Sequence, residues 1–159
     1  MTLLIRPAEA ADVPAIAELI RGLARFEKLE HDVTMTEELL AKNLFGPQRY
    51  AETLLAEDGG APVGFALFFH NFSTFLALPG IYLEDLFVVP EHRGRGIGRS
   101  LLQRLAQIAV ERGCGRLEWS VLDWNRDAIG FYERLGARPN SEWTVYRLAG
   151  EALTSLGRE

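Results

Sequence analysis

The sequence has few of the residues that hold metal ions or form disulfides. Its 159 residues include one cysteine, Cys114, and three scattered histidines, His31, His70 and His92. A single cysteine excludes an internal disulfide and a cysteine-based zinc site, and no two histidines have the spacing of a helical ligand pair. We therefore expect no metal centre. No histidine or aspartate lies near Cys114 in the sequence to activate it, so we do not expect a nucleophilic cysteine either.

Long apolar segments and an excess of basic charge are also lacking. No apolar run approaches the roughly 18 residues that span a bilayer, and Arg6 comes too early for a signal peptide, so we expect a cytoplasmic protein with no membrane partner. Seventeen basic against 22 acidic residues give a net charge of −5, which argues against nucleic-acid binding. The segment from His92 to Arg99 is an exception, because it holds Arg93 and Arg95 and no acid, and it could bind a compact anion.

The composition is that of a folded protein. Apolar residues make up 48% and charged residues 25%, and the length fits a single domain over residues 1–159. The periodicity predicts strands at 3–6, 52–57, 63–69, 81–89, 117–122 and 143–148, and helices after Asp12, after Thr36, after Gly98 and over 127–135. Because a hairpin opens the middle and strands alternate with helices later, we expect an α/β or α+β fold with helices on both faces of a mixed sheet.

A glycine-rich turn joins the most apolar strand to the helix that follows it. Gly94, Gly96 and Gly98 alternate with other residues after Pro90. Glycine allows backbone N–H groups to converge on a phosphate at the positive end of a helix. The spacing is neither the G-x-G-x-x-G of dinucleotide-binding folds nor a Walker loop. A pyrophosphate cradle and a flexible surface turn both remain open from these residues alone.

Two separated motifs resemble the GNAT acetyltransferase superfamily. The pattern Arg93-x-x-Gly96-x-Gly98 after a strand ending in Val89-Pro90 resembles the acetyl-coenzyme A signature of that family. Residues 123–128 and the run from Phe131 to Ala137 resemble its later segment, in the same order. The resemblance extends from Ile5 to Leu148. Residues 5–8, 23–27, 82–88 and 124–125 look most like the diamine (spermidine/spermine) N-acetyltransferase branch and its thialysine-acetylating relative.

The resemblance implies a fold, a co-substrate and an assembly. The fold would be a mostly antiparallel central sheet with helices on both faces and a splay between two central strands. Acetyl-CoA would be the co-substrate, and C-terminal strands, here 143–148, would meet across a homodimer interface. The residues implied in coenzyme binding are Leu86, Phe87, Val88, Arg93, Gly94, Arg95, Gly96, Ile97, Gly98, Arg99, Asn125, Arg126, Asp127 and Ala128.

The resemblance also assigns chemical roles. Tyr132 occupies the position of the general acid, and a phenol is protonated at neutral pH. Glu84 would bind the substrate amine and act as a base through water. From the residues alone, Tyr132 could instead be a packed aromatic and Glu84 a structural ion-pair partner. Strand alternation predicts that Glu84 and Asp85 point to opposite faces. The implied substrate-binding residues are Phe26, Glu27, Glu84, Glu118, Trp119 and Ser120.

The predicted activity follows from these roles. We expect an enzyme that transfers an acetyl group from acetyl-CoA to a primary amine of a small polyamine, diamine or lysine-like compound, by direct attack in a ternary complex. Two alternatives stay open: an acetyltransferase that acts on a protein amine or an aminoglycoside, and a non-catalytic acyl-CoA sensor module.

Overall fold

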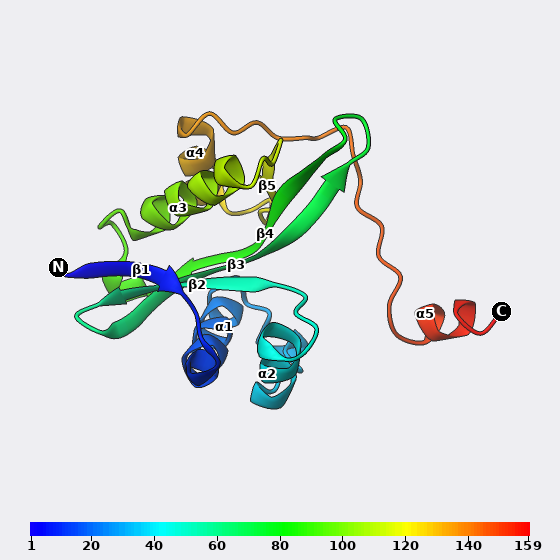
Figure 1. Ribbon diagram of the computed structural model, residues 1–159, viewed down its shortest axis with the longest axis horizontal. Helices are drawn as coiled ribbons and strands as arrows, with labels where there is room; N and C mark the ends of the chain where they lie inside the picture. The colour runs from blue at the N-terminus through cyan, green and yellow to red at the C-terminus, as the bar shows by residue number, and fades with distance from the viewer. The chain divides into compact units, whose positions relative to one another are not determined.

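The computed structural model describes residues 1–159, which form two compact units, 1–120 and 121–159. The first unit is built on a five-stranded sheet of order β1-β2-β3-β4-β5 (Figure 1). The strands are β1 (Leu3–Pro7), β2 (Glu52–Asp58), β3 (Ala61–Ser73), β4 (Leu78–Val88) and β5 (Leu117–Trp119). The first four pair antiparallel, and β4 pairs parallel with β5. The mostly antiparallel mixed sheet is therefore confirmed.

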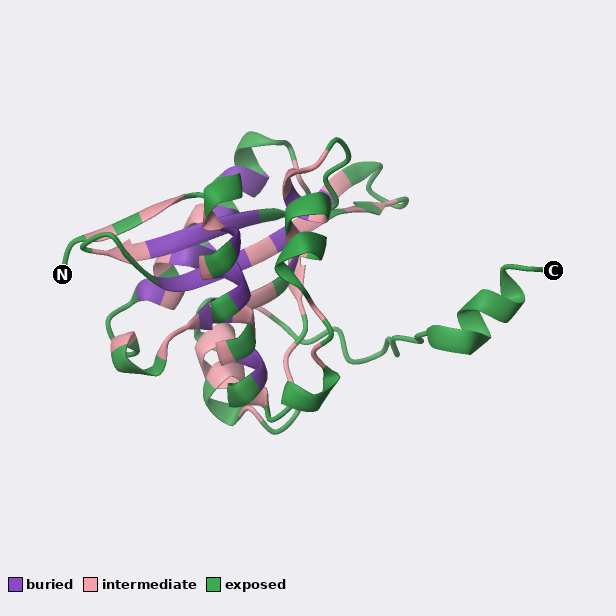
Figure 2. Cartoon of the chain, turned by 90° about the horizontal axis from the view of Figure 1, so that it is seen from below, coloured by how far each residue is buried: buried purple, intermediate pink, exposed green.

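Helices cover both faces of this sheet, as expected. α1 (Val13–Glu27) and α2 (Glu37–Phe45) lie on one face and α3 (Ile97–Glu111) on the other (Figure 1). The buried residues lie on the strands and on the helix sides turned toward them (Figure 2). Residues of α1, α2 and the three middle strands share one core cluster: Ile16, Leu19, Leu23, Leu44, Leu55, Phe65 and Phe87. Their burial fixes α1 against β3 and β4.

Asp12 and Thr36 precede the first two helices, and only Thr36 caps its helix with its side chain. The Thr36 hydroxyl accepts a hydrogen bond from the Leu39 backbone N–H at 3.1 Å, so it caps α2. Asp12 stands at the start of α1, but its side chain makes no cap. Its two carboxylate oxygens instead accept from the Arg6 guanidinium at 2.8 Å, which lowers the pKa of Asp12. Because Arg6 also binds Glu57 at 2.7 Å, one arginine ties β1 to both α1 and β2.

The second half of β4 has no strand on the β5 side, and a short turn connects its end to α3. β5 pairs with only three residues of β4, from Ile81 to Leu83. No strand of the sheet pairs with residues 84–88 on that side, because β5 ends at Trp119. A splay between the two strands stays a prediction. The chain then passes through a short 3₁₀ turn, η3 (Pro90–His92), before α3 begins. The expected strand 117–122 ends early, at Trp119.

The second unit contains two helices, α4 (Arg126–Arg134) and α5 (Gly150–Leu156). α4 confirms the helix expected at 127–135, whereas no helix was expected where α5 forms. The strand expected at 143–148 is not formed, and Trp143, Val145 and Tyr146 are 77%, 85% and 92% exposed. A strand needs a neighbour to bind its backbone N–H and C=O groups, and no strand of this chain pairs with the segment.

Candidate active site

The glycine-rich turn has a backbone that only glycine adopts easily. Gly94 and Gly96 have φ angles of 78° and 80°, in the left-handed region, although a Cβ at either position would meet open space. Glycine is thus needed there for conformation and not for room. Gly96 is the N-cap of α3, and no side chain caps the first turn. The free N–H groups and the positive end of the helix dipole therefore suit an anion.

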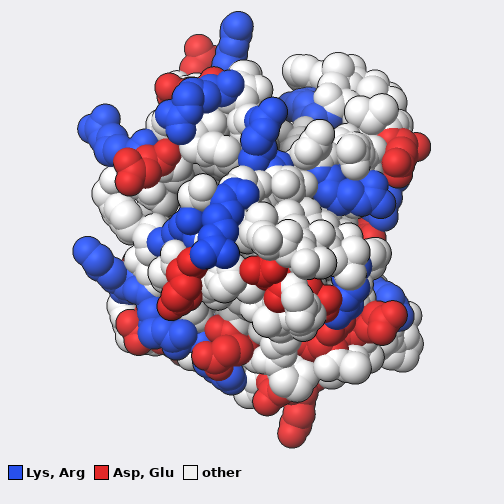
Figure 3. All heavy atoms as spheres, turned by 90° about the vertical axis from the view of Figure 1, so that its left-hand side faces the viewer, with Lys and Arg blue, Asp and Glu red and all other residues white.

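Basic side chains surround this turn. Figure 3 views the molecule from the side of the β2–β3 turn and shows basic side chains across the upper and middle part of the face, with acids below. Arg95 lies 3.9 Å from the Asp58 carboxylate, and His92 Nε2 lies 3.4 Å from the same oxygen. Asp58 also accepts from the Thr2 backbone N–H at 3.0 Å. The β2–β3 turn thereby supports the anion turn from below, while half of the Arg95 side chain stays exposed.

Arg93 is exposed, as the other arginines of the turn are, but its side chain contacts β4 and α1. Its Nε donates to the Val88 carbonyl oxygen at 3.0 Å. Its guanidinium carbon lies 4.4 Å from the centre of the Phe26 ring and 5.5 Å from that of Phe87. The side chain therefore joins the start of the turn to β4 and to the last turn of α1.

The end of β4 offers its backbone rather than its side chains. Phe87 is only 4% exposed and belongs to the core on the α1 side. Leu86 and Val88 are half-buried, and no strand pairs with them on the side of β4 where β5 has already ended. Backbone groups along this open edge can bind an elongated ligand that carries amide groups.

A β-bulge in the middle of β4 changes the expected direction of its two acids. Asp85 pairs with Leu67 of β3, Leu83 pairs with Phe68, and Glu84 between them has no counterpart. Leu83 and Asp85 therefore lie on opposite faces although they are two residues apart. The strict alternation predicted for Glu84 and Asp85 was wrong at this point, because the extra residue shifts the period.

The bulge brings acidic groups together at the end of α1. Burial, and after it the negative charges of Glu84 and Glu27, raise the pKa of Asp85 to about 6. Burial also raises the pKa of Glu27, in the last turn of α1. Glu84 itself is exposed, so it is no buried ion-pair partner. The sequence prediction chose Glu84 over Asp85 for the site, whereas pairing with Leu67 places the Asp85 side chain on the α1 side. An amine cation is the ligand that would relieve the repulsion among these three acids.

The predicted residues Glu118, Trp119 and Ser120 lie further along the sheet, where Glu118 and Trp119 point to opposite faces. Glu118 pairs with Tyr82 of β4 and accepts a hydrogen bond from Asn71 at 3.2 Å. Ser120 Oγ lies 2.6 Å from the Tyr82 hydroxyl. Trp119, between them, is half-buried. Tyr82 and Asn71 hold this end of the sheet in place, and nothing in the sequence pattern singled them out.

The second unit holds the remaining predicted residues on α4. Asn125 is the N-cap, and its Oδ1 accepts from the Ala128 backbone N–H at 3.3 Å. Arg126 and Asp127 form the first helical turn. Tyr132 is half-buried, and its ring centre lies 5.5 Å from that of Phe131. Asn125 thus has a structural role that is independent of any coenzyme contact.

The fold brings a histidine close to Cys114, which the sequence did not indicate. Cys114 Sγ lies 3.9 Å from His70 Nδ1. However, Nδ1 also contacts the Gly80 carbonyl oxygen at 2.9 Å, and Nε2 contacts Arg112 at 2.9 Å. A carbonyl only accepts and a guanidinium only donates, so Nδ1 carries the proton and Nε2 is occupied. His70 therefore has no free nitrogen with which to activate the thiol.

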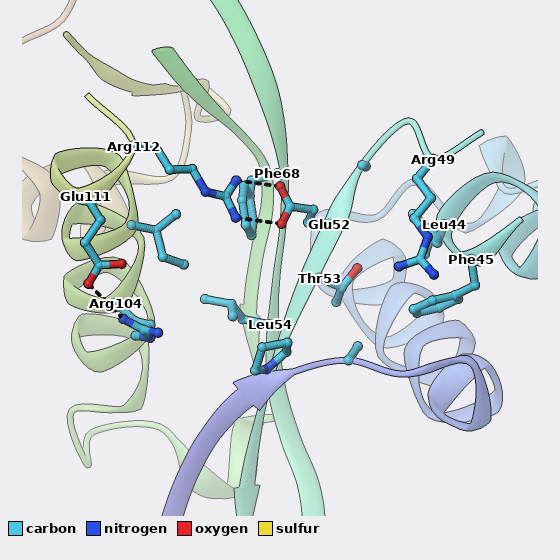
Figure 4. Close-up of a pocket in the computed structure, with 14 residues that line it drawn as sticks. Leu44, Phe45, Arg49, Glu52, Thr53, Leu54, Phe68, Arg104, Glu111 and Arg112 are labelled. Carbon is cyan, nitrogen blue, oxygen red and sulfur yellow. Dashed lines mark hydrogen bonds and ion pairs between the residues drawn. The ribbon is translucent and has the colours of Figure 1, made fainter. Parts of the chain in front are cut away.

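A cavity of about 250 Å³ lies elsewhere in the first unit, where β1 leaves the sheet (Figure 4). Its lining includes Phe45, Arg49, Glu52, Thr53, Arg104 and Arg112. Arg112 is held by Glu52 at 2.7 Å, and Arg104 lies 3.9 Å from Glu111 (Figure 4). None of the predicted site residues lines it, so its size does not locate the active site. No group of three or more metal-binding side chains is present, and no helix is long and apolar enough to cross a membrane.

Comparison with known proteins agrees with this geometry. Residues 14–137 match the model of the acetyltransferase (GNAT) family. A thialysine N-epsilon-acetyltransferase from Mus musculus is 37% identical over 96% of this chain and 95% of that protein. An L-ornithine N5-acetyltransferase from Arabidopsis thaliana is 35% identical over 97% of this chain and 87% of that protein. An integron cassette protein from the mobile metagenome of V. cholerae has a solved structure with a TM-score of 0.84, 28% identity and coverage of 100% of this chain and 99% of that one.

The glycine-rich turn after β4 and the similarity along nearly the whole chain lead to one conclusion. The chain belongs to the GNAT family of acetyltransferases.

Proposed function

We propose that this GNAT acetyltransferase transfers the acetyl group of acetyl-CoA to a primary amine of a small diamine, polyamine or lysine-like compound. The observation that carries the proposal is the acidic group at the bulge, where Asp85 has a pKa of about 6 between Glu84 and Glu27. A protonated amine is complementary to it. The names of two relatives, which specify thialysine and ornithine, support an acceptor with a side-chain amine.

The first unit has a surface that fits acetyl-CoA, the co-substrate of this family. The Gly94–Gly96 turn and the start of α3 would hold the pyrophosphate, with Arg95 and Arg99 near it. The open edge of β4 over 86–88 would bind the amides of the pantetheine arm. When bound, the co-substrate supplies an acyl group activated as a thioester. The first turn of α4, over 125–128, is proposed as a further coenzyme contact.

Each step of the transfer has a candidate residue. Asp85 and Glu27 would hold the ammonium form of the acceptor, and Glu84 would take its proton, directly or through water. The neutral nitrogen then attacks the thioester carbonyl, so that an N–C bond forms and the C–S bond breaks. The second proton that the nitrogen loses would replace the one that Tyr132 gives to the sulfur. N–H groups of the β4 edge would stabilise the oxyanion. Tyr132 would donate its phenolic proton to the departing sulfur.

We also propose that the enzyme is a homodimer. The segment 143–148 is extended and carries the exposed apolar residues Trp143, Val145 and Tyr146. Exposed apolar side chains in such a run are typical of surfaces that a partner covers. The equivalent segments of two copies would meet across the interface.

The test is acetyl-CoA-dependent thiol release across a panel of amines: putrescine, spermidine, lysine, thialysine, ornithine and an aminoglycoside. Coenzyme A binding is measured in parallel by calorimetry. Turnover of diamines or lysine-like amines supports the proposal, and Glu84→Gln should then lower kcat. Turnover of the aminoglycoside alone, or binding with no turnover, would favour the aminoglycoside, protein-substrate or sensor alternatives. No binding of coenzyme A would overturn the proposal.

A further inference from the structure

Arg93 connects two parts of the proposed site that are separate in the sequence. It starts the anion turn, whereas Phe26 lies in the last turn of α1 beside Glu27. The guanidinium carbon of Arg93 lies 4.4 Å from the centre of the Phe26 ring. One side chain therefore contacts both the segment proposed to bind coenzyme and the helix end proposed to bind the amine.

The contacts of Arg93 are directional and involve no acid. Its Nε donates to the Val88 carbonyl at 3.0 Å, and the planar head group lies over the Phe26 ring, with Phe87 5.5 Å away. Arg93 makes no ion pair with an acid. A guanidinium over an aromatic ring is attracted to the negative face of the ring. The position of the Phe26 ring is thus linked to the backbone at Arg93.

We infer that Arg93 is a positioning residue that couples coenzyme binding to amine binding through the Phe26 ring. An anion bound to Gly94–Gly96 fixes the backbone of the turn and, with it, the Arg93 side chain. The fixed guanidinium orders Phe26 and the last turn of α1, which carries Glu27. Coenzyme binding has then already supplied the free energy needed to order Phe26 and the end of α1, so the amine binds more tightly. By reciprocity, the amine tightens the binding of the coenzyme. The inference rests on the proposed function.

The experiment compares the affinity for coenzyme A with and without a saturating amine. Coenzyme A is used in place of acetyl-CoA so that no transfer occurs, and the amine is the one with the highest turnover in the panel. The wild-type protein should bind coenzyme A at least about 5-fold more tightly when the amine is present, the lower end of usual coupling between sites. The reciprocal titration should give the same factor.

Five variants locate the coupling. Arg93→Met and Phe26→Leu should each reduce the factor to about 1, and the double variant should lose nothing more. Phe26→Tyr keeps the ring and should keep the factor, and Arg93→Lys should give an intermediate value because an ammonium cannot stack as a planar group does. The control is Arg25→Met, which removes a positive charge from the same turn of α1 but no ring contact; its factor should equal that of the wild type.

The outcomes separate the two proposals. Turnover with a wild-type factor of 1, or an unchanged factor in Arg93→Met, overturns the inference and leaves the proposed function intact. Loss of coupling in Arg93→Met but not in Phe26→Leu also overturns it, because the effect would not pass through the ring. If the wild type neither binds coenzyme A nor acetylates any amine, both fall. Thermal unfolding of each variant confirms that it is folded, and Phe26, 38% exposed, leaves no buried cavity when it is shortened.

Discussion

Asp85 lies opposite Leu67 in the β3–β4 ladder, on the side of the sheet that α1 covers. Regular alternation with Phe87 places Asp85 on that side, and the extra residue, Glu84, breaks the alternation only between Leu83 and Asp85. The burial that follows raises the pKa of Asp85 to about 6. The free energy of unfolding and the affinity for the amine should therefore both depend on the protonation of Asp85.

The free energy of unfolding should depend on the protonation of Asp85. Its pKa is higher in the folded protein, about 6, than the ordinary value of 3.8, so the folded state binds the proton more tightly. This contribution is fully present below about pH 4 and is lost as the pH rises through 6. Asp85→Asn removes the dependence. Denaturant titrations should show the variant gaining up to about 3 kcal/mol relative to the wild type between pH 4 and pH 7.

The control for this measurement is Glu91→Gln, which neutralises an exposed acid of the same unit. Its stability relative to the wild type should stay nearly constant over the same pH range. A constant difference for Asp85→Asn as well would contradict the assigned burial.

The amine should bind more tightly as Asp85 ionises. KM for the preferred amine should fall as the pH rises through about 6, because a carboxylate holds an ammonium group and a carboxylic acid does not. Asp85→Asn should raise KM about 10-fold at pH 8, on the scale of 1–2 kcal/mol for a charged hydrogen bond, and should abolish this pH dependence. Initial rates from pH 5 to pH 8 test both points. A wild-type profile retained in the variant would assign the titration to another group.

Tyr132→Phe should slow the chemical step. It removes the phenolic proton and keeps the ring beside Phe131, so packing of α4 should change little. We expect a loss of about 10²- to 10⁴-fold in kcat, the usual scale for a general acid, with coenzyme A affinity unchanged. Phe131→Leu is a packing control, expected to lower stability without a loss of that size in kcat. Unchanged turnover in Tyr132→Phe would remove Tyr132 from the mechanism.

Two glycines two residues apart should respond to alanine with opposite signs. Gly96→Ala places a side chain at a φ of 80° and should cost about 1 kcal/mol or more of stability. Gly98→Ala lies inside α3, where its Cβ would meet Val88 Cγ2 at an ordinary 3.9 Å, and should add about 0.5–1 kcal/mol. Thermal or denaturant unfolding compares them. Equal effects would show that the turn relaxes and does not need glycine.

Charge placed in the extended segment should weaken the proposed dimer. Tyr146→Asp adds a charge to a side chain that is 92% exposed in the single chain, so the fold of one copy should be unaffected. Sedimentation velocity at micromolar concentration should show a dimer for the wild type and a shift toward monomer for the variant. Glu151→Ala, in α5, serves as a control outside the segment. A monomeric wild type would refute the proposed assembly.

The sequence by itself determined the elements whose signals are local. The apolar run at 81–89, the periodic helices after Asp12 and Gly98, and the Thr36 cap depend on propensity and spacing, which adjacent residues supply. The arrangement of Gly94 and Gly96 before α3 likewise follows from backbone conformation alone. The mostly antiparallel sheet and the family assignment could therefore be predicted without coordinates.

Only the tertiary structure decided which side chains meet. Asp85 lies on the α1 side of the sheet because it pairs with Leu67, a residue 18 positions away. The contact of Arg93 with Phe26 spans 67 positions. The Asp12 carboxylate binds the Arg6 guanidinium and does not cap α1, because a hydrogen bond between two charged groups is stronger than one to a backbone N–H. The segment 143–148 has the pattern of a strand but no neighbour within its own chain. Local pattern sets a residue's tendency, but pairing and packing across the fold set its partners, and the partners decide the chemistry.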